Sequence, residues 1–158
     1  MKKWLILSSV VIVLDQLTKL LAVNSLSLYE SIAVIPGLNF TLLHNTGAAF
    51  SFLSNAGGWQ RWFFIVLAFG ISLFIVYWMR SLESDKKWLL CALALVLGGA
   101  IGNVIDRIYL GYVIDFIDFY YKAYHWPAFN IADSAICVGA VMLIIDAIWL
   151  NHSENQTS

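Results

Sequence analysis

The stretch Trp62-Phe-Phe-Ile-Val-Leu-Ala-Phe-Gly-Ile-Ser-Leu-Phe-Ile-Val-Tyr-Trp-Met79 decides the fold, because it contains no charged residue. A helix that crosses the hydrocarbon core of a bilayer needs about 20 mostly apolar residues. This stretch is close to that length and has no proline that would break a helix. It therefore predicts a transmembrane helix.

Three further stretches have the same character and lie at about 4–23, 88–105 and 135–150. The whole chain is 61% hydrophobic and 12% charged, with a mean hydropathy of +0.79. Soluble domains are about a quarter charged and about half apolar. We therefore expect a single polytopic membrane domain over residues 1–158, with four spans and a disordered tail at 151–158. The net charge of −1 gives no basic field for binding nucleic acid.

Tryptophan residues support these boundaries, because an indole ring prefers the level of the lipid headgroups. All seven fall at or just beyond an expected span end: Trp4, Trp59, Trp62, Trp78, Trp88, Trp126 and Trp149.

Lysine and arginine residues indicate the orientation, since short loops rich in them stay in the cytoplasm. They occur before the first span and between the second and third, at Lys2, Lys3, Arg80, Lys86 and Lys87. The stretch 24–60 has none, and the longer stretch 106–133 has only Arg107 and Lys122. We therefore expect both termini in the cytoplasm and these two stretches on the outer face.

The first outer stretch contains an alternating segment, Ser31-Ile-Ala-Val-Ile-Pro-Gly-Leu-Asn-Phe-Thr-Leu-Leu-His-Asn45, with Pro36-Gly37 as a turn. Partial alternation on both sides of a turn predicts short strands. Strands of this kind cannot lie in the hydrocarbon unless protein covers them. The predicted fold is an all-α integral membrane protein with four transmembrane helices and a small β-rich extracytoplasmic element between spans one and two.

Two charges interrupt the first span, at Asp15 and Lys19. They are four residues apart, so they share one face of a helix. A charge at the bilayer centre costs about 3 kcal/mol. The pair is either self-neutralising, with the lysine reaching to the surface, or part of a polar interior; we favour the second interpretation.

A second polar group ends the third span, at Asn103, Asp106 and Arg107. The spacing of three and four residues puts all of them on one helix face. Gly98 and Gly102 just before them form a small-residue pair, typical of close helix packing. The polar group either terminates the helix or forms a site that holds a polar backbone.

Three more acids follow in the second outer stretch. Asp115 and Asp118 are set among large apolar residues in Tyr112-Val-Ile-Asp-Phe-Ile-Asp-Phe119, where burial would raise a carboxyl pKa. Asp133 precedes the fourth span and, taken alone, is accounted for as a helix cap.

The end of span three and the start of span four lie at the same membrane face, so Asp106, Asp115, Asp118 and Asp133 are expected to converge there. Two close carboxyls share one proton, so that one accepts a proton from water while the other donates one to a peptide carbonyl. This is aspartic-protease chemistry, and it needs no cofactor. Spacing does not decide which two acids form the pair. No histidine or cysteine spacing indicates a metal site, so we expect no metal.

Five motifs in order carry a resemblance to bacterial lipoprotein signal peptidase, also called signal peptidase II. They are Asp15-Gln-Leu-Thr-Lys19, Asn45-Thr-Gly-Ala-Ala-Phe50, Gly99-Ala-Ile-Gly-Asn-Val-Ile-Asp-Arg107, Val113-Ile-Asp-Phe116 and Phe129-Asn-Ile-Ala-Asp-Ser134. The resemblance covers essentially the whole chain. Each motif is modest alone, but five in order are highly specific.

The resemblance implies that Asp115 and Asp133 are the catalytic pair. Other motif residues would shape the site or bind substrate: Asp15, Lys19, Asn45, Gly47, Asn103, Asp106, Arg107 and Asn130. The family removes signal peptides from prolipoproteins, cutting before a diacylglyceryl cysteine, and is inhibited by globomycin. We therefore expect a monomeric enzyme of the bacterial inner membrane, surrounded by lipid, with its site at the periplasmic face.

Two other classes of protein compete with this interpretation. A proton-coupled transporter or channel also uses intramembrane acids, although transporters usually show inverted repeats and this chain shows none. A non-catalytic assembly or chaperone subunit would use the carboxylates to hold its loops together. Hydrolysis of a lipidated peptide by the purified protein distinguishes the peptidase from both.

Overall fold

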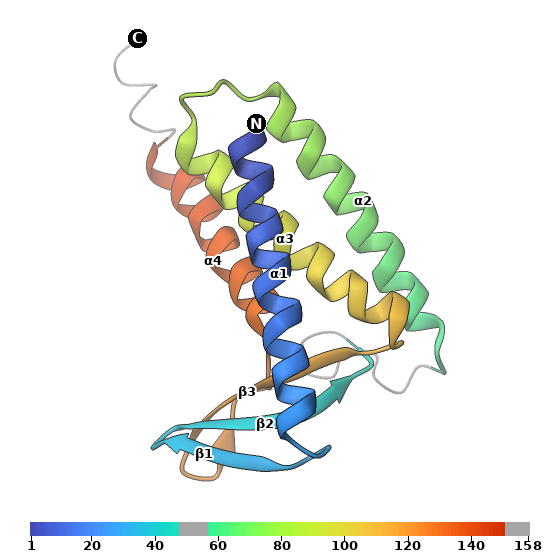
Figure 1. Ribbon diagram of the computed structural model, residues 1–158. Helices are drawn as coiled ribbons and strands as arrows, with labels where there is room; N and C mark the ends of the chain where they lie inside the picture. Colours follow the sequence, from blue (N-terminus) through green and yellow to red (C-terminus); the bar gives the residue numbers. More distant parts are fainter. Residues whose placement is uncertain (48–56, 151–158) are drawn as a thin grey trace.

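The computed structural model describes residues 1–47 and 57–150, and four long helices dominate it (Figure 1). They are α1 (Lys2–Ser25), α2 (Trp59–Ser81), α3 (Lys87–Tyr109) and α4 (Ile131–Ile145), which continues as the short π-helix η2 (Asp146–Leu150). All four are long and apolar enough to cross a membrane, the fourth over Ile131–Ile148. The tail at 151–158 and residues 48–50 of the second motif lie outside the described residues.

The start of α4 differs from the prediction, because the helix begins at Ile131 rather than near residue 135. Asn130 caps it: its side-chain oxygen accepts a hydrogen bond from the main-chain N–H of Asp133 at 2.9 Å. The Asp133 carboxylate accepts one in return from the main-chain N–H of Asn130 at 3.3 Å. This reciprocal capping box adds a helical turn and places Asp133 within it.

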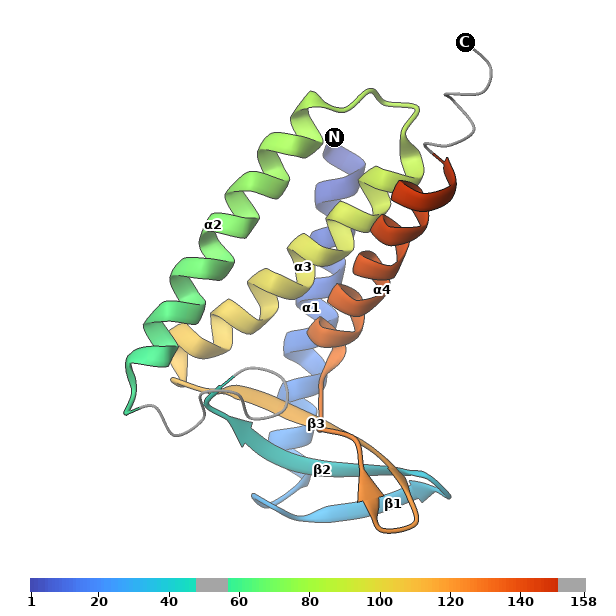
Figure 2. The same ribbon diagram turned by 180° about the vertical axis from the view of Figure 1, so that it is seen from behind.

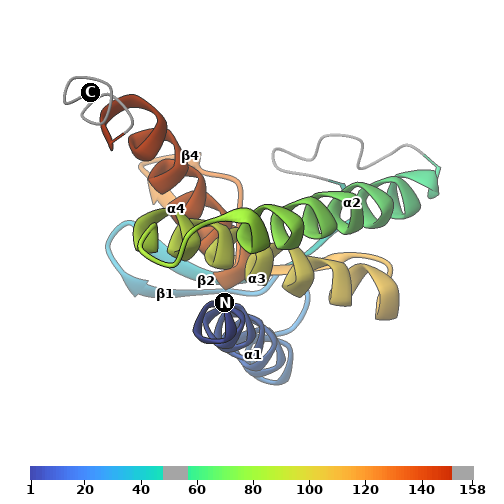
Figure 3. The ribbon, with the colours of Figure 1, turned by 90° about the horizontal axis from the view of Figure 1, so that it is seen from above.

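Helix α3 is the centre of the bundle and packs against α1, α2 and α4 (Figure 3). The close packing depends on Gly98, Gly99 and Gly102 in α3 and on Gly139 in α4. A Cβ at Gly98 would lie 2.8 Å from the carbonyl oxygen of Ser8 in α1. A Cβ at Gly99 would overlap the carbonyl oxygen of Ala132 in α4. The predicted role of small residues in helix packing is seen in these contacts.

The change Gly99→Ala is expected to destabilise the protein by about 1–3 kcal/mol, because the added methyl group meets main-chain atoms of Ala132 that cannot rotate away. Gly70→Ala in α2 is the matched control, since a Cβ there would lie within 4 Å of no other element among residues 1–47 and 57–150. Alanine also favours a helix over glycine by up to about 1 kcal/mol, so the control should be neutral or slightly stabilising. Unfolding in detergent micelles measures both, and equal stabilities would contradict the packing account.

An antiparallel sheet lies at the end of the bundle where α1 ends and α4 begins (Figure 2). Its strands, in spatial order, are β1 (Ser31–Ile35), β2 (Leu38–Asn45), β3 (Val113–Tyr121) and β4 (Tyr124–His125). A buried cluster attaches the sheet to the end of α1: Ala22, Leu26, Leu42, Ile114 and Phe116.

The predicted all-α class is too narrow, because the chain also forms this sheet. The predicted place of the strands is also incomplete, because half of them come from the second outer stretch and not from the first. The strands β1 and β2 lie where alternation predicted them, between α1 and α2. The strand β3, by contrast, was not predicted. It is rich in β-branched and aromatic residues, and its first four residues are all buried, so it shows no alternation of apolar and polar positions.

Candidate active site

Asp115 and Asp133 come from different elements and meet at one residue, Asn130. Asp115 lies in β3 and is 2% exposed, whereas Asp133 lies in the first turn of α4 and is half-buried. The side-chain amide of Asn130 donates to Oδ1 of Asp115 at 2.8 Å. Its main-chain N–H donates to Oδ2 of Asp133 at 3.3 Å. The two carboxyls are therefore adjacent in space.

Amide donors occupy the remaining oxygens of both carboxyls. Asn45, at the end of β2, donates to Oδ2 of Asp115 at 2.9 Å. Asn103, in α3, donates to Oδ1 of Asp133 at 2.7 Å. Every oxygen of the pair thus accepts a hydrogen bond from a neutral amide, which fixes the orientation of each carboxyl without neutralising it.

Burial, and after it the charge of Asp133, raise the pKa of Asp115 from 3.8 to about 7. Hydrogen bonds from Asn45 and Asn130, together with the charge of Lys19, oppose this rise. The burial effect is larger because a carboxylate loses hydration in a dry site. At neutral pH Asp115 therefore holds a proton for much of the time.

The stability of the folded chain is expected to fall as the pH rises from about 4 to about 7, because of Asp115. The folded chain keeps the Asp115 proton up to a pKa of about 7, whereas the unfolded chain releases it near 3.8. The folded state binds more protons across this window, so the free energy of unfolding decreases with pH. Unfolding temperatures of the wild type and Asp115→Asn, compared at each pH, measure the effect. A difference between them that is constant with pH would contradict it.

A buried ion network lies next to the pair and is centred on Lys19. Its Nζ lies 2.8 Å from Asp15, 2.9 Å from Asp106 and 3.0 Å from the side-chain oxygen of Asn103. Lys19 is only 2% exposed, so the interpretation in which it reaches the surface is wrong. Three acceptors around its ammonium group account for its burial.

The same network positions the segments that carry the pair. Asp15 accepts a hydrogen bond from the main-chain N–H of Ala132, next to Asp133, at 2.9 Å. Asp106 accepts one from the main-chain N–H of Ile114, next to Asp115, at 3.1 Å. The ion network therefore holds the start of α4 and the start of β3 in place.

Gln16 belongs to this network and was not singled out from the sequence. Its side-chain amide donates to Asp106 at 2.8 Å, and to Asp15 and the carbonyl of Gly102 at 3.2 Å each. It joins α1 to α3 through two acceptors, Asp106 and the carbonyl of Gly102. The signal that could have revealed it is an amide side chain beside Asp15 inside an apolar span.

Arg107, Gly47 and Asn45 act as a group. The Arg107 guanidinium donates to the carbonyl of Gly47 at 2.8 Å. The N–H of Gly47 donates to the side-chain oxygen of Asn45 at 3.0 Å, which leaves the Asn45 amide group directed at Asp115. Arg107 thus holds the turn that orients Asn45.

Asp118 does not join the other acids that the sequence brought together. Residues three apart in a strand point to opposite faces, so Asp118 lies on the other face of β3 from Asp115. There it bonds Asn39 at 3.1 Å, Thr41 at 3.4 Å and Nδ1 of His125 at 2.9 Å. The predicted convergence holds for the other three acids and is wrong for Asp118.

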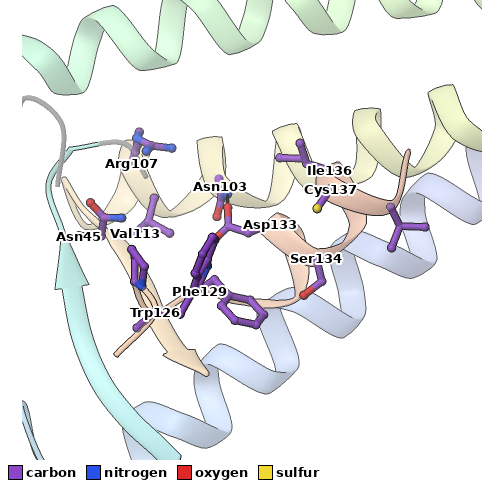
Figure 4. A pocket seen from close by; sticks show the side chains of 13 residues that line it. Asn45, Asn103, Arg107, Val113, Trp126, Phe129, Asp133, Ser134, Ile136 and Cys137 are labelled. Atoms are coloured by element: carbon purple, nitrogen blue, oxygen red, sulfur yellow. Dashed lines mark hydrogen bonds between the residues drawn. The ribbon is translucent and has the colours of Figure 1, made fainter. Parts of the chain in front are cut away.

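A cavity of about 530 Å³ opens beside Asp133 (Figure 4). Its polar wall is formed by Asn45, Asn103 and Arg107, and the rest of its wall is mainly apolar, from residues 126–129 and 136–138. Asp133 faces this space, whereas Asp115 is buried behind it. Within residues 1–47 and 57–150, no three His, Cys, Asp or Glu side chains gather as metal ligands would.

Comparisons with known proteins agree with one another. The family model described as “Signal peptidase (SPase) II” matches residues 7–149. The lipoprotein signal peptidase of Alteromonas mediterranea is 56% identical over 91% of this chain and 79% of its own length. That of Acinetobacter baumannii (strain ATCC 17978) is 54% identical over 98% of this chain and 88% of its own.

A solved structure described as “Bacterial membrane enzyme structure by the in meso method at 2.3 A resolution” matches the fold with a TM-score of 0.86. It is 33% identical, and the match covers 98% of this chain and 92% of the other. A second, at 1.9 Å, gives a TM-score of 0.82 at 33% identity, covering 94% of each chain.

Proposed function

The chain belongs to the signal peptidase II family, and from this premise we propose that it is an aspartic endopeptidase of the bacterial inner membrane. It removes signal peptides from diacylglyceryl-modified prolipoproteins by cutting before the lipidated cysteine. One observation carries the aspartic mechanism: Asn130 hydrogen-bonds both Asp115 and Asp133, so that two carboxyls from different elements meet beside a cavity.

The two carboxyls have different tasks in the proposed reaction. Asp133 faces the cavity and takes a proton from the attacking water, while Asp115, with its pKa of about 7, gives its proton to the peptide carbonyl oxygen. The water oxygen then bonds to the carbonyl carbon. When the C–N bond breaks, Asp133 returns its proton to the leaving cysteine nitrogen, and the carbonyl re-forms as Asp115 recovers its own.

The amide side chains supply orientation in this proposal. Asn45 and Asn103 donate to the two carboxyl oxygens that Asn130 does not bond. Both residues also line the cavity, so they remain beside a bound peptide. The apolar wall from α4 includes Cys137 and Val138, which are exposed and suit acyl chains that enter from the bilayer. Lysine and arginine placement supports cytoplasmic termini and a site at the periplasmic face.

A proton-coupled transporter is not favoured. The family match spans residues 7–149, and relatives that cover most of the chain are named as peptidases.

The purified full chain in detergent, incubated with a synthetic lipopeptide that carries a diacylglyceryl cysteine, tests the proposal. We expect cleavage on the amino side of that cysteine, identified by the masses of both products, and much slower cleavage of the same peptide without lipid. The absence of hydrolysis by folded protein would overturn the proposal, and so would a cut at another bond. Proton flux through vesicles that contain the chain would instead favour the transporter.

A further inference from the structure

The segment 126–129 forms one wall of the cavity and pairs with β3 on its other side. Phe129 donates to and accepts from Ile117, at 3.0 and 2.9 Å, in an antiparallel bridge. In such a pair the residue next to a bonded one can direct its main-chain groups away from the partner strand. Ala128, which precedes Phe129, makes no main-chain hydrogen bond to β3.

These two groups of Ala128 are unpaired within the described part of the chain. Neither its N–H nor its C=O makes a hydrogen bond to residues 1–47 or 57–150, although Ala128 lines the cavity with Pro127 and Phe129. A strand edge with unpaired main-chain groups is a template for an extended peptide. The cavity thus has an apolar wall with one donor and one acceptor at a strand edge.

We propose that the peptide on the mature side of the scissile bond binds as an extended strand along residues 127–129 and exchanges two main-chain hydrogen bonds with Ala128. The inference rests on the proposed function and adds the manner in which the substrate is held. Because main-chain bonds select no side chain, peptides with different residues after the cysteine are held alike.

The direction of the edge decides which side of the substrate it binds. The segment runs from β4 toward the start of α4, so its inner end adjoins Asn130 and Asp133 and its outer end reaches the sheet (Figure 2). A peptide bond at the carboxyl pair would therefore direct one flank along 127–129, away from the bundle. The other flank runs back beside α4, where the apolar signal peptide belongs.

A series of lipopeptides, each with one N-methylated amide at successive positions after the cysteine, tests this inference with the wild-type protein. Methylation of the amide that faces the Ala128 carbonyl should lower kcat/KM by about tenfold, chiefly through KM, since one hydrogen bond is lost. Methylation at the two neighbouring positions should change it by less than about threefold, because those amides point away. Exchange of the side chains at the same positions is the control and should have a comparably small effect.

A variant pair tests the other hydrogen bond. Ala128→Pro removes the N–H and should lower kcat/KM by about tenfold through KM, whereas Ala128→Gly keeps the N–H and should stay within about threefold. A cooperative unfolding transition shows whether each variant is folded, and the lipopeptide series remains decisive if Ala128→Pro is not. If kcat/KM is the same for every N-methylated lipopeptide and the parent lipopeptide is cleaved normally, the strand-edge inference is overturned and the proposed function is not. Failure to cleave the parent lipopeptide overturns the proposed function instead.

Discussion

Replacement of Asp115 by asparagine is expected to lower the rate of lipopeptide cleavage by at least about 1,000-fold while the protein stays folded. Asparagine has the shape of the carboxyl group and keeps one acceptor oxygen, so it can retain one of the two hydrogen bonds that Asn45 and Asn130 donate to Asp115. It has no acidic proton to give to the peptide carbonyl. Asp133→Asn should be equally inactive, because it removes the group that accepts a proton from water.

Asp118→Asn is the matched control, since Asp118 is also a buried carboxyl in β3, three residues further on. Its partners are Asn39, Thr41 and His125 on the opposite face, so only a few-fold change is expected. Turnover is measured on the diacylglyceryl lipopeptide, and folding by a cooperative unfolding transition. Equal losses for Asp115→Asn and Asp118→Asn would remove the assignment of the pair.

The change Lys19→Met is expected to lower the free energy of unfolding by about 3–5 kcal/mol, the largest stability effect that we predict. Methionine fills a similar volume but leaves the carboxylates of Asp15 and Asp106 buried without their shared cation. Asp15 and Asp106 also hold the segments next to the proposed catalytic pair, so activity should fall as well. Unfolding in detergent micelles measures the change in stability.

Lys2→Met controls for the loss of a lysine, because Lys2 is exposed at the start of α1 and should change stability by less than about 0.5 kcal/mol. Asp106→Asn added to Lys19→Met removes one of the stranded charges and should recover part of the loss. If Lys19→Met is as stable as Lys2→Met, the ion network does not hold the bundle together.

The four spans were predictable because charge-free apolar stretches have few alternatives. Their ends were harder to place, and the start of α4 shows why. Taken alone, Asp133 was accounted for as a helix cap, yet Asn130 takes that position and Asp133 completes a reciprocal capping box. Either residue type caps a helix well, so the choice depends on where the preceding chain leaves β3.

The strand β3 was missed for a different reason. Strand prediction depends on alternation of apolar and polar residues, and Val113–Phe116 is buried on both faces. The same segment carries Asp115, so its burial, together with the charge of Asp133, raises the pKa of that acid. Burial on both faces thus removed the strand signal at the position of the proposed catalytic residue Asp115.

Spacing predicted that the acids would converge, but not how they would divide their roles. Helical spacing correctly placed Asn103 and Asp106 on one face, where both contact Lys19, whereas Arg107 bonds the carbonyl of Gly47. Side chains in a strand alternate between its two faces, which puts Asp115 and Asp118 on opposite faces of β3. This separation was not predicted because β3 had not been recognised as a strand. Lys19 was interpreted with one partner at four residues, whereas its other acceptors come from α3.

Infrared spectroscopy of the purified protein with isotope-labelled aspartate tests the shared proton most directly. Near pH 6 we predict one protonated carboxyl that is absent from Asp115→Asn and that disappears in the wild type as the pH rises through about 7. Ionised carboxyls at both Asp115 and Asp133 at that pH, with no protonated band that depends on either residue, would contradict the account.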